Sequence, residues 1–248
     1  MRVSMIETFA QFAAHDENFI LVTADLGFNV FEKFEEAFPK QFYNVGVCEQ
    51  NMIGVAAGLA ATGKKVFCYS IANFSTLRCL EQIRNDLCYH NLNVSLISMG
   101  GGFNYGPLGM THHATEDISV MQSIPNLSIF TPFDRQTTVI ALETALRNAG
   151  PSYIRLEKTT PDISSVAPND EQSTAIKKIT DVNIISFGTL AKKIADEISV
   201  IEAGIGQRCG VLAISRIKPL SEDLLLKALK GSKYVIIVEE NNVVGGLG

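Results

Sequence analysis

The chain has 248 residues, of which 46% are hydrophobic and 19% are charged, and its formal net charge is -5. This balance is typical of a globular protein with a substantial core. The sequence has no dense run of Lys or Arg that would follow a phosphate backbone and no stretch of 18 apolar residues, which argues against nucleic acid as a partner and against a membrane span.

Short β-rich runs alternate with helical periodicity over the first 156 residues. In chain order we expect a helix at 5–15, strand 19–23, helix 30–38, strand 42–45, helix 50–62, strand 65–69, helix 75–91, strands 94–98 and 128–131, helix 135–148 and strand 152–156. This alternation predicts βαβ units, a mostly parallel sheet and therefore an α/β fold.

Residues 159–180 interrupt this pattern, because they contain Pro161 and Pro168 and little apolar content. We interpret residues 161–180 as a linker between a first domain at 1–160 and a second at 181–248. The second domain is predicted to hold strands at 182–187, 210–214 and 234–238 and helices at 190–203 and 222–229. Its last eight residues have the composition of a loop that leads into another helix, so we expect this domain to be truncated.

Residues 43–63, YNVGVCEQNMIGVAAGLAATG, are the most informative for function. A strand is expected to end near Val47, and Glu49 opens a helix with a face of small residues that permits close approach of another backbone. A carboxylate at a helix start has a simple structural explanation, since it interacts favourably with the helix dipole. Glu49 alone therefore does not identify a site.

Four motifs in a fixed order are more specific. They are CEQNMIGVAAGLA (48–60), FSTLRCLEQIR (74–84), GPLGMTHHATED (106–117) and YIRLEK (153–158). In sequence and order they resemble the transketolase family, over residues 22–158, and the tail at 182–248 resembles the start of the family's C-terminal domain. The resemblance implies a parallel-sheet pyrimidine-binding domain for thiamine diphosphate, followed by a smaller α/β domain.

The resemblance also implies a role for each matching residue. Glu49 matches the glutamate that hydrogen-bonds N1′ of the cofactor's pyrimidine and exchanges a proton with it, a task that suits a carboxyl group shielded from water. Phe74 matches the aromatic residue that stacks on the aminopyrimidine, with Ile71 on the same wall. His112 matches a histidine that reaches the cofactor's amino group or the reacting carbonyl.

Asp25 and Leu26, at the end of the first strand, match the pair that faces the thiazolium side of the cofactor, where α/β sheets bind ligands. Simpler explanations exist for these residue types: Asp25 would cap the next helix, Phe74 would belong to the core, and a single histidine in a loop would be solvated. The glycines at 100–102 and at 106 and 109 favour a loop held close to another group, which supports a functional His112.

The resemblance fails where the family recognises the sugar. Leu108, Gly100 and Asn29 replace an aspartate, a histidine-like polar residue and a phosphate-binding serine. Lys158 aligns with the arginine that holds the sugar phosphate, but it lacks the bidentate fork. We expect Asn29, His113 and Lys158 to contact a substrate that differs from the usual ketose and aldose phosphates: an unphosphorylated or nucleotide-linked sugar, or a small 2-oxoacid.

The family holds the cofactor's diphosphate through Mg²⁺ (or Ca²⁺) on a Gly-Asp-Gly segment of a separate domain, and this sequence contains no Gly-Asp-Gly. The resemblance therefore implies a split enzyme, with an N-terminal diphosphate-binding subunit as partner in an α2β2 assembly. We predict transfer of a ketol group from a ketose-type donor to an aldehyde-type acceptor. The alternatives are the β subunit of a 2-oxoacid-decarboxylating enzyme (a dehydrogenase E1 or a deoxyxylulose-phosphate-synthase-like enzyme), a non-catalytic subunit and an unrelated nucleotide-binding module.

The cysteines bear on the compartment. There are five, an odd number, and no two have C-x-x-C spacing. Residues 1–16 lack the apolar core of a signal peptide, because Glu7 and Gln11 interrupt them. We therefore predict free thiols in a cytoplasmic protein, and we interpret Cys48, beside Glu49, as a packing residue rather than a nucleophile.

Overall fold

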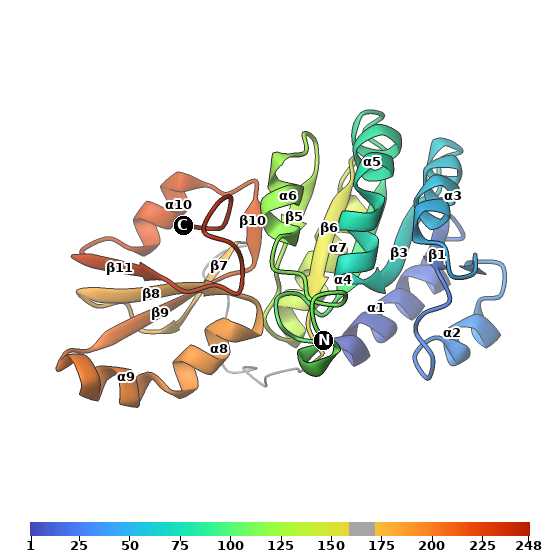
Figure 1. Ribbon diagram of the computed structural model, residues 1–248. Coiled ribbons are helices and arrows are strands. Elements are labelled where there is room, and N and C mark those ends of the chain that lie inside the picture. Colours follow the sequence, from blue (N-terminus) through green and yellow to red (C-terminus); the bar gives the residue numbers. More distant parts are fainter. Residues whose placement is uncertain (159–171) are drawn as a thin grey trace.

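The computed structural model describes residues 1–158 and 172–248, which fold around two sheets (Figure 1). The first part of the chain contains α1 (Arg2–His15), β1 (Phe19–Thr23), α2 (Glu32–Ala37), β2 (Phe42–Asn44), α3 (Glu49–Ala61), β3 (Lys65–Ile71), α4 (Ala72–Ser75), the 3-10 turn η1 (Leu77–Cys79), α5 (Leu80–Gln82), the π-helical turn η2 (Ile83–Cys88), β4 (Val94–Met99), the 3-10 turn η3 (Gly106–Leu108), α6 (Asp117–Ser123), β5 (Ser128–Phe130), α7 (Arg135–Arg147) and β6 (Ser152–Leu156). The second part contains β7 (Ser173–Lys177), β8 (Val182–Phe187), α8 (Gly188–Asp196), α9 (Ile198–Ile205), β9 (Cys209–Ile214), β10 (Arg216–Lys218), α10 (Glu222–Ala228) and β11 (Tyr234–Ile237).

The larger sheet has seven strands in the order β10-β5-β6-β4-β3-β1-β2. Adjacent strands in this sheet are parallel to each other, except that β10 is antiparallel to β5. Strands β1, β4 and β6 are buried along their whole length, as expected when helices cover both faces of a parallel sheet. The predicted α/β fold with a mostly parallel sheet is confirmed.

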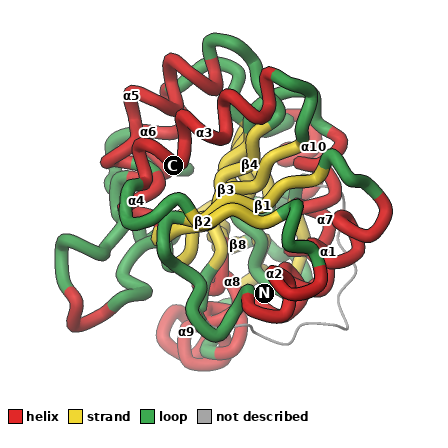
Figure 2. Tube along the Cα trace, turned by 90° about the vertical axis from the view of Figure 1, so that its right-hand side faces the viewer, coloured by secondary structure: helices red, strands yellow, loops and turns green. Residues whose placement is uncertain are grey.

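Side chains of the central strands alternate between two hydrophobic clusters, one on each face of the sheet. Val22 and Leu96 pack in the cluster that also contains Met52 of α3, whereas Leu21 packs in the cluster that contains Phe9 of α1. Figure 2 shows α3, α5 and α6 on one side of the strands and α1 and α7 on the other. The sheet is thus covered on both faces, and its two ends remain the places where loops meet.

The smaller sheet has the order β11-β8-β9-β7, with β7 antiparallel to its neighbour. Strand β10 leaves this part of the chain and joins the edge of the larger sheet, where Arg216 pairs with Phe130. Phe187 and Ile214 of the smaller sheet belong to the same hydrophobic cluster as Val22 and Met52. The two sheets are therefore joined by both a strand pair and a shared core.

The linker predicted at 161–180 is too long at its C-terminal end. Residues 173–177 form strand β7, which pairs with residues 211–214 of β9 at the edge of the smaller sheet. This strand begins with two buried polar residues, Ser173 and Thr174, so it lacks the alternation of apolar and polar residues that predicts a strand. The remaining part of the predicted linker, up to residue 171, lies outside the described residues.

The single helix predicted at 75–91 is wrong, because this segment is broken into α4, η1, α5 and η2. Two hydroxyls bond back to carbonyls four residues earlier: Ser75 Oγ donates to the carbonyl of Ile71 at 3.0 Å, and Thr76 Oγ1 donates to that of Ala72 at 2.6 Å. Such bonds compete with the helical backbone pattern. The helix predicted at 190–203 is also interrupted: α8 ends before Glu197 and α9 begins after it.

Two further elements, α6 and β10, were not predicted, because each is short and lies between segments with stronger periodicity. Among the residues that the structure describes, no helix has the length and apolar character needed to span a bilayer.

Candidate active site

The predicted site residues all follow the carboxyl ends of strands in the larger sheet. Asp25, Leu26 and Asn29 follow β1, Glu49 follows β2, Ile71 ends β3 and Phe74 follows it, His112 and His113 lie in the connection after β4, and Lys158 follows β6. Carboxyl ends of parallel strands meet at one edge of a sheet, so the fold gathers segments that are distant in the sequence.

Glu49 is the first residue of α3, and only 2% of it is exposed. Its Oε2 accepts a hydrogen bond of 2.6 Å from Nη1 of Arg78, whose side chain is 47% exposed. The guanidinium also lies over the ring of Phe74, with Cζ 4.3 Å from the ring centroid. The buried carboxylate, the guanidinium and the aromatic face therefore form one cluster.

Arg78 was not singled out from the sequence, although it lies within the motif at 74–84. The helix was expected to begin after Phe74, at residue 75, so its periodicity did not relate Phe74 to Arg78. In the structure the chain turns at Thr76, which separates α4 from η1 and leaves Arg78 beside both Phe74 and Glu49.

An aromatic row extends from Phe74 toward the end of β6. The ring of His112 lies 5.1 Å from that of Phe74 and 5.6 Å from that of Tyr105, measured between centroids. Nζ of Lys158 lies 3.6 Å from the centroid of Tyr105. Burial, and then the neighbouring Tyr69, raises the pKa of the Tyr105 phenol to about 12. Tyr105 is a second residue that the sequence did not identify.

The two histidines of the loop after β4 differ in their contacts. Nδ1 of His112 forms a hydrogen bond of 2.9 Å with the hydroxyl of Thr111, which orients the ring. Nε2 of His113 lies 2.9 Å from the carbonyl of Gly106, to which it donates, and its ring packs edge-on against Phe103. His112 thus lies in the aromatic row, whereas His113 is held by its own loop.

Leu26 and Ile71 line a small cavity of about 150 Å³ together with Tyr105, so these two predicted residues lie close together. Asp25 lines a neighbouring cavity of about 330 Å³. Its backbone has φ of 55°, and its carboxylate accepts a hydrogen bond of 3.2 Å from the amide of Asn44. Asn29 is exposed on the same connection, where its N–H donates to Glu32 at 2.6 Å.

The loop that carries both histidines is closed at its base. Gly102 and Ala114 form an antiparallel bridge with backbone hydrogen bonds of 2.8 and 3.0 Å. Below the bridge, Arg155 of β6 is only 2% exposed and pairs through Nη1 with Asp117, at 3.3 Å, where the loop enters α6. Gly101, at the other end of the loop, packs directly on the guanidinium of Arg155. Both ends of the loop are therefore fixed on one buried side chain.

We predict that Gly101→Ala lowers the free energy of unfolding by about 2 kcal/mol or more. A Cβ at this position would come within 1.5 Å of Nε of Arg155, whose guanidinium is buried and held by its ion pair with Asp117. Denaturant unfolding of the purified chain measures the effect. Gly54→Ala is the matched control: Gly54 is an exposed helical glycine with nothing within 4 Å of the added Cβ, so it should be neutral or slightly stabilising. Equal stability of the two variants would contradict the packing described here.

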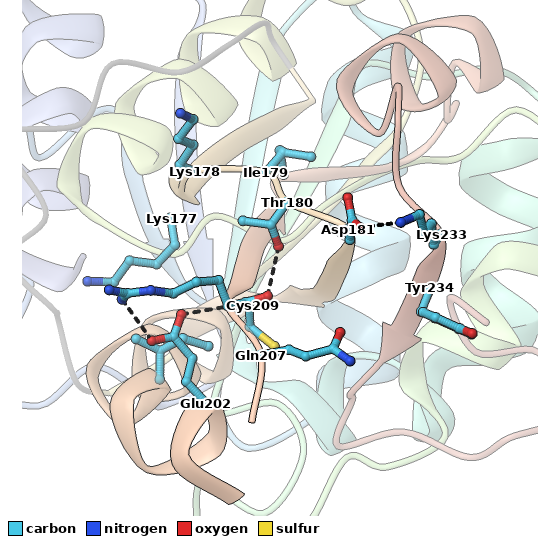
Figure 3. A pocket seen from close by; sticks show the side chains of 12 residues that line it. Lys177, Lys178, Ile179, Thr180, Asp181, Glu202, Gln207, Cys209, Lys233 and Tyr234 are labelled. Carbon is cyan, nitrogen blue, oxygen red and sulfur yellow. Dashed lines mark hydrogen bonds and ion pairs between the residues drawn. The ribbon is translucent and has the colours of Figure 1, made fainter. Parts of the chain in front are cut away.

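A larger cavity, of about 1090 Å³, lies in the second part of the chain and contains none of the predicted site residues (Figure 3). It opens at the amino ends of the strands, because Asp181 precedes β8 and Lys233 precedes β11. Two of its basic residues are already paired: Lys233 with Asp181 at 2.6 Å, and Arg208 with Glu202 at 3.1 Å. We therefore do not assign the chemistry of the site to this cavity.

The five cysteines are free, as predicted. The interpretation of Cys48 as a packing residue is wrong, because the residue is exposed at the N-terminal end of α3. Burial raises the pKa of Cys79 and of Cys88 to about 12, which keeps these thiols unreactive. Within residues 1–158 and 172–248, no group of three or more His, Cys, Asp or Glu side chains is arranged to hold a metal ion.

Comparison with known proteins identifies the family to which this fold belongs. The family model for the transketolase pyrimidine-binding domain matches residues 1–162. One of the subunits of the apulose-4-phosphate transketolase from Actinobacillus succinogenes is 34% identical over 98% of this chain and 79% of its own length. The 1-deoxy-D-xylulose-5-phosphate synthase of Listeria innocua is 34% identical over 95% of this chain, but the match covers only 38% of that protein.

Among solved structures, a split-gene transketolase described as an inactive beta4 tetramer superimposes with a TM-score of 0.86 at 31% identity. The match covers 99% of this chain and 81% of that one. Similarity in both sequence and structure therefore extends from the larger sheet through the smaller one.

Proposed function

The chain belongs to the transketolase pyrimidine-binding family, and from this premise we propose that Glu49, Phe74 and His112 bind and activate thiamine diphosphate in a split transketolase-like enzyme. The observation that carries the proposal is the buried carboxylate of Glu49 beside the face of Phe74. The relatives that match along most of their length are β-type subunits, so the chain is the pyrimidine-binding half of such an enzyme.

The residues present fit the pyrimidine part of the cofactor. The guanidinium of Arg78 is flat, lies over the ring of Phe74 and donates an N–H to Glu49. An aminopyrimidine that is protonated at N1′ presents the same two features, a planar π-face and an N–H on the edge that faces Glu49, so the same pair of residues can receive it. The stacking wall continues through His112, whose ring lies 5.1 Å from Phe74.

Thiamine diphosphate bound here would supply a nucleophilic thiazolium carbon. Glu49 holds and exchanges the proton at the edge of the pyrimidine, and its burial keeps water from competing for that hydrogen bond. Phe74 fixes the plane of the ring. His112 is oriented through Nδ1 by Thr111, and its other nitrogen would remain available to the reacting groups. Leu26 and Ile71, with Asp25 beside them, form the wall on the thiazolium side.

The partner is proposed from chemistry that this chain lacks. Its sequence contains no Gly-Asp-Gly segment, and the described residues hold no cluster of metal ligands. We assign the diphosphate and its Mg²⁺ (or Ca²⁺) to an N-terminal transketolase subunit in an α2β2 assembly. The similar tetramer of β chains alone is described as inactive, which supports a requirement for the second subunit.

The substrate is proposed to bind at the end of the aromatic row. Lys158 lies exposed over Tyr105 and provides a positive charge there, and desolvation and then Arg2 lower its pKa. Asn29 and His113 are proposed as further contacts. Exposed Leu108 stands where the family has an aspartate, so we propose a ketol donor and an aldehyde acceptor that differ from the usual sugar phosphates. A role in carbohydrate metabolism in the cytoplasm, where five free thiols stay reduced, completes the proposal.

The test is reconstitution. We expect neither this chain nor its partner alone to transfer a ketol group, and their mixture with thiamine diphosphate and Mg²⁺ to do so with hydroxypyruvate as donor. The same assay with pyruvate instead of hydroxypyruvate tests the deoxyxylulose-phosphate-synthase-like alternative. This alternative is tested because a synthase of that kind is 34% identical to the chain. Both donors lose CO2, so a mixture that uses pyruvate and not hydroxypyruvate would replace transfer of a ketol group with transfer of the two-carbon unit of pyruvate, which lacks the hydroxyl. An inactive mixture that also fails to bind thiamine diphosphate would contradict the proposed function.

A further inference from the structure

Arg78 connects the two groups that are proposed to receive the pyrimidine. Its Nη1 lies 2.6 Å from Oε2 of Glu49, and its Cζ lies 4.3 Å from the centroid of Phe74. The side chain of Arg78 is 47% exposed, whereas that of Glu49 is 2% exposed. The guanidinium is therefore the solvent-facing member of the pair and covers one face of the aromatic ring.

We propose that Arg78 is a built-in substitute for the cofactor's pyrimidine. In the free subunit its guanidinium occupies the position between Glu49 and Phe74, and thiamine diphosphate binds by displacing it into solvent. This inference rests on the proposed function, because it requires the same carboxylate and the same ring to receive the cofactor.

The chemistry of the two groups explains why they compete. A guanidinium is planar and delocalised, stacks on aromatic faces and offers N–H donors in its plane, like the edge of an aminopyrimidine that is protonated at N1′. Both groups seek a hydrogen bond to the carboxylate of Glu49 and van der Waals contact with the same face of Phe74. Two flat groups cannot occupy one face of a ring at stacking distance, so binding of one releases the other.

The arrangement also explains why Arg78 can leave. Nearly half of its side chain is already in water, and it is bound by one hydrogen bond to Glu49. Arg155, by contrast, is 2% exposed and fixed beneath the loop by Asp117. In the free subunit Arg78 keeps the buried charge of Glu49 paired, and its occupancy reduces the apparent affinity for the cofactor in proportion to the fraction of open subunits.

The test measures cofactor affinity, not activity. The variant Arg78→Met keeps the length of the stem and removes the charge and the donors. Calorimetric titration of the reconstituted complex with thiamine diphosphate and Mg²⁺ should give a Kd about tenfold lower than that of the unmodified complex. The melting temperature of the free chain should fall, because Glu49 loses its partner. Arg78→Lys, which keeps the charge but cannot stack as a plane, should give a smaller decrease in Kd.

Arg84→Met is the matched control, because Arg84 is exposed on a nearby turn and hydrogen-bonds Asn85. The complex that contains Arg84→Met should bind thiamine diphosphate with the same Kd as the unmodified complex. An unchanged or higher Kd for Arg78→Met would overturn the proposal, since Arg78 would then be a bystander or a cofactor ligand. If Arg78→Met does not fold, Arg78→Lys is decisive by the same criterion. Absence of thiamine diphosphate binding by the unmodified complex would instead refute the proposed function, so the two failures are distinct.

Discussion

Replacing Glu49 with glutamine is expected to lower kcat of the reconstituted enzyme by about 10²–10⁴-fold. The amide has nearly the same shape as the carboxylate, but it cannot exchange a proton with the pyrimidine. Because only 2% of Glu49 is exposed, bulk water cannot replace it efficiently as the proton carrier. Steady-state rates at saturating donor, acceptor and cofactor measure the loss.

A second carboxylate in the same region provides the control. Glu81 is exposed on α5, within the same motif as Phe74, and Glu81→Gln should leave kcat within about twofold of the unmodified enzyme, as for other surface changes. Calorimetry with thiamine diphosphate shows whether Glu49→Gln still binds the cofactor. If Glu49→Gln binds it and retains full activity, the chain is a non-catalytic subunit that kept the fold.

The largest expected effect on stability belongs to Asp117. Its carboxylate is fully buried, accepts a hydrogen bond of 2.6 Å from the hydroxyl of Tyr153 and pairs with Arg155 at 3.3 Å. Burial, and then the charge of Asp117, raises the pKa of Tyr153 well above its usual range, so the phenol remains a donor. Asp117→Asn removes the ion-pair partner of the buried guanidinium of Arg155, which then keeps only the more indirect charges of Glu157 and Glu240. We expect the free energy of unfolding to fall by about 3–5 kcal/mol.

Denaturant unfolding of the free chain measures this loss, and Asp196→Asn is the control. Asp196 is exposed and pairs with the partly buried Lys192, four residues earlier in α8, and such helical pairs contribute about 0.5 kcal/mol. A loss below about 1 kcal/mol for Asp117→Asn would contradict the view that Arg155 and Asp117 anchor the histidine loop. The loss of unfolding free energy for Tyr153→Phe should lie between those for Asp196→Asn and Asp117→Asn, since Tyr153→Phe removes one hydrogen bond and no charge.

Much of the larger sheet could be predicted because its strands are buried on both faces and read as apolar runs, such as FILVT at 19–23. The burial of Glu49 followed from its place in a motif and not from periodicity. Elements that depend on tertiary contacts were missed. Strand β10 has only three residues and forms through pairing with β5 at a sheet edge, where Arg216 lies opposite Phe130. No local sequence pattern encodes this pairing.

The same distinction applies to the site. Phe74 and His112 were predicted because they lie in recognisable motifs, and the structure places their rings 5.1 Å apart. Arg78 was missed because its role depends on the turn at Thr76, where hydroxyl–carbonyl bonds interrupt the expected helix. Tyr105 was missed because its contact with Lys158 joins residues from different strand connections. Such contacts become visible only once the strand order is known.

The proton-exchange role of Glu49 is tested most directly by following the C2 proton of thiamine diphosphate in D₂O, an experiment that needs neither donor nor acceptor. The complex of this chain with its partner should exchange the proton for deuterium much faster than free cofactor does. Glu49→Gln should bind the cofactor and lose that acceleration, by about 10²-fold or more. Equal exchange rates in the two complexes, with the cofactor bound in both, would contradict the assignment of Glu49 as the activating group.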